Sequence, residues 1–119
     1  MVLIREDGTR WDFPGGRPEP GESWEQTMRR EILEEACATV LDAQLLGYCR
    51  FLDTDGPEAA VVKVRSMWRA AVRLSSWEPR FEVQHRQVVD AARVVTIVDV
   101  PPGVEPIYVR FLHDAGVID

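Results

Sequence analysis

The chain has 119 residues, 45% of them hydrophobic and 29% charged, which is enough for one domain with a core and too little for two. Its formal net charge of −6 argues against tight, sequence-independent binding to nucleic acid, because that binding needs basic surface to neutralise phosphates. Apolar runs stay well short of the ~20 residues that a membrane span needs, so we expect no transmembrane helix.

The N-terminus turns acidic after three apolar residues, whereas a signal peptide needs a basic start and a longer apolar stretch. We therefore expect the protein to reside in the cytoplasm. Cys37 and Cys49 are the two cysteines, and without a secretory signal two reduced thiols are favoured over one disulfide.

The first elements predicted in chain order are two short strands. Residues 2–5 form a short apolar run that is typical of a buried strand. The hairpin signal Asp7-Gly8 follows, and the alternating residues 10–13 are predicted to return as the second strand. Pro14, Gly15 and Gly16 then interrupt the pattern.

A helix is predicted after the Pro/Gly-rich loop of residues 17–22. Ser23 is a good N-cap, and Gln26 three residues later completes a capping-box pattern. Apolar or small residues then recur every four positions and predict a core-facing stripe, namely Met28, Ile32 and Ala36. We expect the helix to end near Cys37.

The middle of the chain is predicted to be extended. Residues 38–52 and the apolar, Arg-rich residues 59–74 read as strands, with a turn over residues 54–57 between them. Residues 75–80 read as a loop.

The last part of the chain contains one ambiguous segment and one helix. Within residues 88–100, Asp90 to Arg93 favour a helix start, whereas β-branched residues from Val94 to Val98 favour a strand. Residues 105–115 read as a closing helix that Gly116 stops. The whole pattern predicts a single α/β (α+β) domain over residues 1–119, with helices flanking a mixed sheet.

Three glutamates share one face of the first predicted helix. Glu31, Glu34 and Glu35 have the i, i+3, i+4 spacing. Like charges so placed repel one another, and a hard divalent cation such as Mg²⁺ or Mn²⁺ would turn that repulsion into binding. Because Mg²⁺ is usually held by one or two carboxylates together with substrate phosphates, the pattern indicates phosphoryl or pyrophosphate chemistry. Taken alone, the three carboxylates also fit an acidic, solvated helix face.

Residues beside the three glutamates support the metal site. The forked guanidinium of Arg30 is suited to orient a carboxylate such as Glu22 or Glu34. Gly15 and Gly16 allow the backbone to approach an ion closely, so that a carbonyl group can serve as a further ligand.

The full spacing of these residues resembles the Nudix box. Gly16, Glu22, Arg30-Glu31-Ile32 and Glu34-Glu35 match the pattern G-x5-E-x7-R-E-U-x-E-E-x-G-U, where U is a bulky aliphatic residue. The preceding Phe13-Pro14-Gly15 also looks like the entry to the box. The resemblance is specific over residues 13–38 and looser beyond them.

The resemblance implies a Nudix-like α/β/α sandwich that hydrolyses a pyrophosphate bond in a nucleoside diphosphate linked to another group. Mg²⁺ or Mn²⁺ would be the cofactor. By position, Glu31, Glu34, Glu35 and the Gly15 carbonyl are the implied metal ligands, and Gly16 and Glu22 help to orient the site. The implied catalytic residues are Glu34, Glu31, Arg30 and Glu82.

The general base is open between a glutamate of the box and one from the second half of the chain. Glu82, which follows a loop, is the preferred second-half residue, and Glu58 and Glu78 are weaker candidates. A surface glutamate with no catalytic role is the alternative for Glu82.

Two departures from the family pattern stand out. Cys37 replaces the final glycine of the box, where a left-handed helix end costs a residue with a Cβ roughly 1 kcal/mol. At that place a packing thiol is expected rather than a nucleophile.

The second departure is that the strand which the family usually places before residues 2–5 is missing, which leaves an open sheet edge. We therefore expect a homodimer. These departures keep a second function open, a Nudix-like module that binds a nucleotide or sugar nucleotide without cleaving it.

Overall fold

The computed structural model describes residues 1–6, 10–52, 56–57, 60–79, 83–98 and 103–118. The elements within these residues are, in order, β1 (Val2–Glu6), α1 (Trp24–Ala36), β2 (Ala38–Leu52), β3 (Val62–Leu74), β4 (Val83–Val88), the 3-10 helix η1 (Ala91–Arg93), α2 (Val94–Ile97) and α3 (Glu105–Asp114). The predicted α+β class is confirmed. None of the described helices is both long and apolar enough to cross a membrane.

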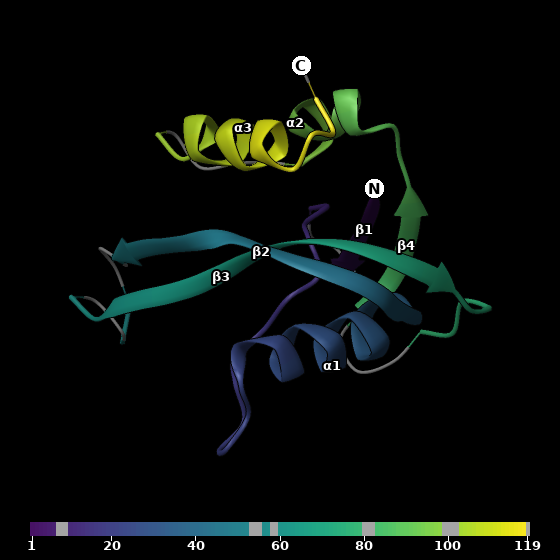
Figure 1. Ribbon diagram of the computed structural model, residues 1–119, viewed down its shortest axis with the longest axis horizontal. Coiled ribbons are helices and arrows are strands. Elements are labelled where there is room, and N and C mark those ends of the chain that lie inside the picture. Colours follow the sequence, from purple (N-terminus) through teal and green to yellow (C-terminus); the bar gives the residue numbers. More distant parts are fainter. Residues whose placement is uncertain (7–9, 53–55, 58–59, 80–82, 99–102, 119) are drawn as a thin grey trace.

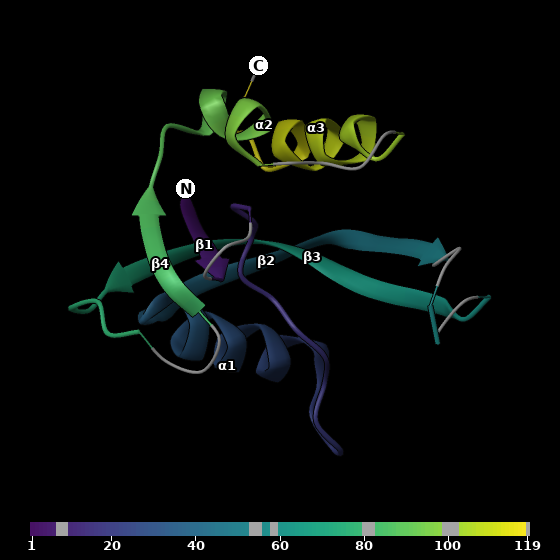
Figure 2. The ribbon, with the colours of Figure 1, turned by 180° about the vertical axis from the view of Figure 1, so that it is seen from behind.

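The elements form layers around the long β2–β3 ribbon. Figure 1 shows α1 on one side of this ribbon and α3 on the other, with β1 and β4 near one end of it. Figure 2, from behind, shows the same arrangement. The layered α/β/α arrangement that we predicted is therefore present. Both described ladders, β1–β4 and β2–β3, are antiparallel, where we expected parallel and antiparallel pairing in one mixed sheet.

The N-terminal strand pairs with a strand that we did not predict. β1 runs antiparallel to β4, with Leu3 opposite Gln87 and Ile4 opposite Arg86. Residues 10–13, which we predicted as a second strand, form only an isolated bridge within the described residues. In this bridge Ile4 and Asp12 exchange two backbone hydrogen bonds of 2.9 Å. The turn signal before it lies outside the described residues.

Helix α1 begins and ends as predicted. The Ser23 hydroxyl accepts from the Gln26 amide at 3.1 Å, and the Gln26 side chain accepts from the Ser23 amide at 2.8 Å. This capping box satisfies two amides of the first turn. The helix ends at Cys37, whose φ of 50° is left-handed. On its inner face Ala36 is fully buried.

The ambiguous segment before α3 is helical rather than a strand. The Asp90 carboxylate accepts from the Ala92 amide at 3.1 Å and caps η1, after which α2 continues. Val94 and Val98 are buried in one core cluster with Leu3 and Leu112. Burial of these valines outweighs their β propensity. The closing helix α3 is confirmed, with Gly116 left-handed behind it.

Candidate functional site

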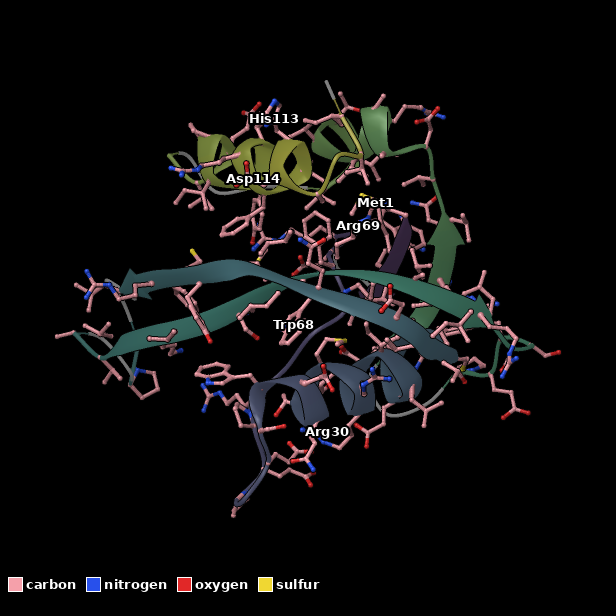
Figure 3. The ribbon with its side chains drawn as sticks, viewed as in Figure 1. Met1, Arg30, Trp68, Arg69, His113 and Asp114 are labelled. Atoms are coloured by element: carbon pink, nitrogen blue, oxygen red, sulfur yellow. The ribbon has the colours of Figure 1, made fainter. Side chains whose placement is uncertain are left out.

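Arg30 connects the Pro/Gly-rich loop to helix α1. Its Nε donates to Oε2 of Glu22 at 2.7 Å and its Nη2 donates to Oε1 of Glu22 at 2.9 Å. The same Nη2 donates to the Arg17 carbonyl at 2.9 Å. The predicted contact between Arg30 and Glu22 is therefore confirmed as a bidentate pair, which fixes both distance and orientation. Figure 3 shows Arg30 on the side of α1 that faces away from β2 and β3.

The third nitrogen of Arg30 lies among the other glutamates. Nη1 is 2.6 Å from Oε1 of Glu31, 3.2 Å from Oε2 of Glu34 and 3.7 Å from Oε1 of Glu19. The Glu31 side chain is 13% exposed and that of Glu34 is 34% exposed. One guanidinium thus neutralises carboxylates that would otherwise repel one another on this helix face.

The glycine pair packs its backbone against the same helix face. The Gly15 amide donates to Oε1 of Glu35 at 2.7 Å. A Cβ added at Gly16 would lie 2.5 Å from the Glu31 carboxylate. Only glycine therefore fits at position 16 without moving Glu31, and the loop brings its backbone directly onto two of the three glutamates that are predicted to bind the metal.

These contacts change the protonation of Glu22. The pKa of Glu22 is lowered from 4.5 to about 2, first because Arg30 donates hydrogen bonds to the carboxylate and second because the Glu19 amide also donates to it. Thr27 adds a hydroxyl donor at 3.0 Å. The pKa of Arg30 is raised by the same pairing with Glu22. Glu22 is thus held as an anion well below neutral pH.

We expect the pairing of Glu22 with Arg30 to make the free energy of unfolding depend on pH in the acidic range. The folded pKa of Glu22 is depressed, so its contribution is fully present above about pH 4.5 and is lost as the pH falls toward about 2. In urea unfolding at a series of pH values, the free energy of unfolding of the wild type should fall more steeply across this window than that of Glu22→Gln. Parallel curves for the two proteins would contradict the assignment. Glu25→Gln, which changes an exposed carboxylate in the first turn of α1, should follow the wild type.

The donor set fits a hard divalent ion. Oxygen ligands are what Mg²⁺ and Mn²⁺ prefer, and Gly16 lets the Glu31 carboxylate approach the loop backbone, since a Cβ there would lie 2.5 Å from it. In the described residues no three His, Cys, Asp or Glu side chains converge as an ion would need. Glu31 and Glu34 point to Arg30 instead, so binding an ion requires these flexible side chains to turn from one cation to another.

The structure brings together the predicted box residues but leaves the second-half candidates apart. The residues that meet at α1 are Gly15, Gly16, Glu22, Arg30, Glu31, Glu34 and Glu35. Glu82 and Glu58 lie outside the described residues. Glu78 lies at the other end of the helix, where its carbonyl accepts from Cys37 Sγ at 3.5 Å. Both cysteines are free thiols and Cys37 is buried, as predicted for a packing residue.

Three residues contribute contacts to this site that were not predicted from the sequence. These contacts come from the Arg17 carbonyl, the Glu19 carboxylate and the Thr27 hydroxyl. Thr27 is the buried polar residue of α1, and its place one turn after the N-cap, facing the loop, is the signal that would have found it. The loop contacts depend on the path of a Pro-rich segment, which spacing alone does not specify.

Comparisons with known proteins agree with this geometry. The NUDIX domain matches residues 1–115. A Bacillus subtilis (strain 168) protein described as "Putative 8-oxo-dGTP diphosphatase" is 54% identical over 35 residues, which make up 29% of this chain and 24% of that protein. The match thus spans about a quarter of that relative.

Solved structures share the fold. A MutT structure from work on Aliivibrio salmonicida and Vibrio cholerae has 26% identity and a TM-score of 0.64, covering 95% of this chain and 85% of that one. The Bacillus subtilis pyrophosphohydrolase BsRppH has 22% identity and a TM-score of 0.70, covering 99% and 76%. The Nudix domain of Shewanella oneidensis NrtR, solved with ADP ribose, has 15% identity and a TM-score of 0.65, covering 95% and 75%. Since the domain match covers nearly the whole chain and includes the carboxylate helix with its glycine loop, the protein belongs to the Nudix family.

Proposed function

We propose that the protein is a metal-dependent hydrolase that cleaves a pyrophosphate bond in a nucleoside diphosphate linked to another group. The observation that carries this proposal is the packing of Gly15 and Gly16 against Glu35 and Glu31, with Arg30 bound beside them. A structural helix face would not need a glycine whose Cβ would strike a carboxylate. The names of the relatives, a diphosphatase and a pyrophosphohydrolase, support the same reaction class.

Glu31, Glu34 and Glu35 would hold the ion, with the Gly15 carbonyl as a further ligand. When bound, Mg²⁺ or Mn²⁺ supplies charge stabilisation of the diphosphate and lowers the pKa of a bound water. Arg30 would hold the loop against the helix through Glu22 while the side chains of Glu31 and Glu34 turn toward the ion.

A carboxylate that accepts the proton of the attacking water completes the reaction. Glu34 is our candidate, because its side chain is more open than that of Glu31 and its contact with Arg30 is longer, 3.2 Å against 2.6 Å. A role for Glu82 stays a prediction from the sequence, as does residence in the cytoplasm.

A substrate screen tests the proposed function. The purified protein is incubated with nucleoside triphosphates, ADP-ribose, sugar nucleotides and dinucleoside polyphosphates, each with Mg²⁺ and with Mn²⁺, and phosphate-containing products are measured. We expect metal-dependent release from at least one class. If calorimetry instead shows binding with no turnover and little dependence on metal, the protein is a nucleotide-binding module. Arg30 already donates hydrogen bonds to Glu31 and Glu34, so these carboxylates are neutralised without a metal ion. This observation favours the second function.

Gly16→Ala should impair the site while leaving the fold intact. The added Cβ would lie 2.5 Å from the Glu31 carboxylate, and a flexible side-chain end can move aside at little cost to stability. We expect a 10- to 100-fold lower rate, typical of displaced site geometry, with an unchanged unfolding midpoint. Gly15→Ala is the steric comparison: a Cβ there would meet nothing within 4 Å and the backbone groups of residue 15 are kept, so this variant should lose less activity than Gly16→Ala. Equal losses of rate in Gly16→Ala and Gly15→Ala would show that the close contact between Gly16 and Glu31 has no special role in the reaction.

We also propose that the protein forms a homodimer. Large apolar side chains are exposed along the β2–β3 ribbon, among them Tyr48, Leu52, Val62 and Val64. Such surfaces commonly mark interfaces. Light scattering at micromolar concentration should give twice the mass of the chain, and Val62→Lys should shift it toward one chain. A single-chain mass for the wild type would show that this surface does not associate.

A further inference from the structure

The last turn of α1 carries two of the three glutamates that are predicted to bind the metal. Oε2 of Glu34 lies 3.2 Å from Nη1 of Arg30. Glu35 accepts from the Gly15 amide at 2.7 Å, only one residue before the helix ends at Ala36. The last four carbonyls of a helix have no partner within it, and helix ends fray where nothing else holds them. The geometry of the metal site therefore depends on what orders this end of α1.

The residue that follows α1 makes its end harder to keep in place. Cys37 has a left-handed φ of 50°, a conformation that crowds a Cβ and that glycine adopts more readily. A cation near the C-terminus of a helix stabilises it, but none of the described residues in the last turn of α1 is basic. The helix end therefore has to be held by contacts from other parts of the chain.

Arg86 of β4 supplies a cation at this place. Its Nη1 donates to the carbonyls of Ala36 at 2.8 Å and Ser75 at 2.9 Å, and a longer contact of 3.4 Å reaches the carbonyl of Cys37. The guanidinium also lies 5.4 Å from the centroid of the Trp77 ring. The side chain is half-buried and is held by carbonyls together with an aromatic ring, so its position at the helix end is well defined.

The contacts of Arg86 join segments that are far apart in the sequence. The Ser75 amide donates to the Cys37 carbonyl at 2.9 Å, so both backbone groups of Ser75 take part in the same network. Val83, the first residue of β4, is buried in one cluster with Ala36. Figures 1 and 2 show the start of β4 beside the last turn of α1. Packing thus brings β4 to the helix end, and Arg86 bonds to the carbonyls there.

We propose that Arg86 is a positioning residue of the metal site, which orders the last turn of α1 and thereby Glu34 and Glu35 before an ion binds. This inference rests on the proposed metal-dependent hydrolysis. The described contacts of Arg86 are with backbone carbonyls and an aromatic ring, so it acts through the helix and not on the ion. Carboxylates that are already in place lose less freedom when an ion binds, and ordering therefore raises the affinity for the ion.

The direction of the effect on metal affinity separates positioning from charge. Arg86 is itself a cation, so the loss of its repulsion alone would make a divalent ion bind more tightly to Arg86→Met. The loss of ordering would make the ion bind more weakly. Arg86→Lys keeps the charge but not the planar fork, so charge alone predicts no change there, whereas positioning predicts a partial loss.

Calorimetric titration with Mn²⁺ measures the affinity without any substrate. We expect Arg86→Met to bind Mn²⁺ at least about 10-fold more weakly than the wild type, as is typical when residues that orient metal ligands are lost. Arg86→Lys should lie between the two. Arg73→Met is the matched control, because Arg73 is an exposed arginine near the end of β3, and it should bind as the wild type does.

Amide hydrogen exchange, followed by NMR without metal, tests whether the ordering is local. In Arg86→Met the amides of Glu35 and Ala36 should exchange several-fold faster than in the wild type, because the last turn opens more often. The amides of Arg29 and Arg30, in the middle of α1, should keep their wild-type rates. An equal acceleration of all four amides would show that Arg86 stabilises the fold as a whole, and the positioning role would be wrong.

Hydrolysis rates give a third readout. Arg86→Met should need at least about 10-fold more Mn²⁺ for its half-maximal rate, while the maximal rate stays close to that of the wild type. A lower maximal rate with an unchanged need for Mn²⁺ would overturn the inference, and so would wild-type or tighter Mn²⁺ binding by both Arg86 variants. Arg86→Lys undergoes the same measurements if Arg86→Met does not fold. A wild-type protein that binds no Mn²⁺ would contradict the proposed function itself, and the positioning role with it.

Discussion

Glu35→Gln is expected to lower the hydrolysis rate of the best substrate at least about 100-fold, because the charge that would hold the ion is lost while the size of the side chain is kept. The amide oxygen of Gln can still accept from Gly15, whose amide lies 2.7 Å from Oε1 of Glu35, so the loop should stay in place. Steady-state rates with Mg²⁺ measure the effect.

The matched control for this variant is Glu25→Gln on the same helix. Glu25 is exposed and forms an ion pair of 3.4 Å with Arg29, away from the glycine loop, so its neutralisation should leave the rate unchanged. Titration of Mn²⁺ by calorimetry gives a second readout, in which Glu35→Gln should bind the ion more weakly. Wild-type rates for Glu35→Gln would rule out the proposed metal site.

Arg30→Lys is expected to lower activity about 10- to 100-fold, the range typical of residues that orient metal ligands. Lysine keeps the charge but not the fork that bonds Glu22 at two points and also reaches the Arg17 carbonyl. The loop that carries Gly15 and Gly16 should then be held less firmly. The pKa of Glu22, which depends first on Arg30, should rise toward its ordinary value.

Arg29→Lys tests whether the loss is specific to the fork. Arg29 precedes Arg30 on the helix and is exposed, with a 3.1 Å hydrogen bond to the Val40 carbonyl. Its replacement should leave both the rate and the titration of Glu22, followed by NMR, unchanged. If Arg30→Lys kept full activity, a point charge would be sufficient at this position and the positioning role would be wrong.

Local signals in the sequence predicted the functional helix well. The start at Ser23 with Gln26, the end at Cys37 and the contact between Arg30 and Glu22 all depend on residues close in sequence. Such contacts follow from helix geometry and capping chemistry, which spacing reveals directly. The long β2 and β3 strands were also predicted, since their apolar and β-branched residues continue over many positions.

Features that depend on distant partners could not be predicted in the same way. β4 contains Gln84, His85, Arg86 and Gln87, a polar run that lacks the alternation of a strand. It is extended because it pairs with β1, about eighty residues earlier in the chain. Likewise, the segment at Val94 is helical because its burial against Leu3 outweighs local propensity. The loop contacts of Arg17 and Glu19 have the same origin.

Arg86 links the end of the functional helix to the remote strand β4. Its Nη1 donates to the carbonyls of Ala36 at 2.8 Å and Ser75 at 2.9 Å, and its guanidinium lies 5.4 Å from the centroid of the Trp77 ring. A cation at this position satisfies carbonyls that the last turn of a helix leaves without partners. In kinetic terms, the first turns of α1 can form from neighbouring residues, whereas its last turn is completed only when a residue fifty positions later arrives. The glutamates nearest that end, Glu34 and Glu35, should therefore be among the last parts of the helix to become ordered during folding.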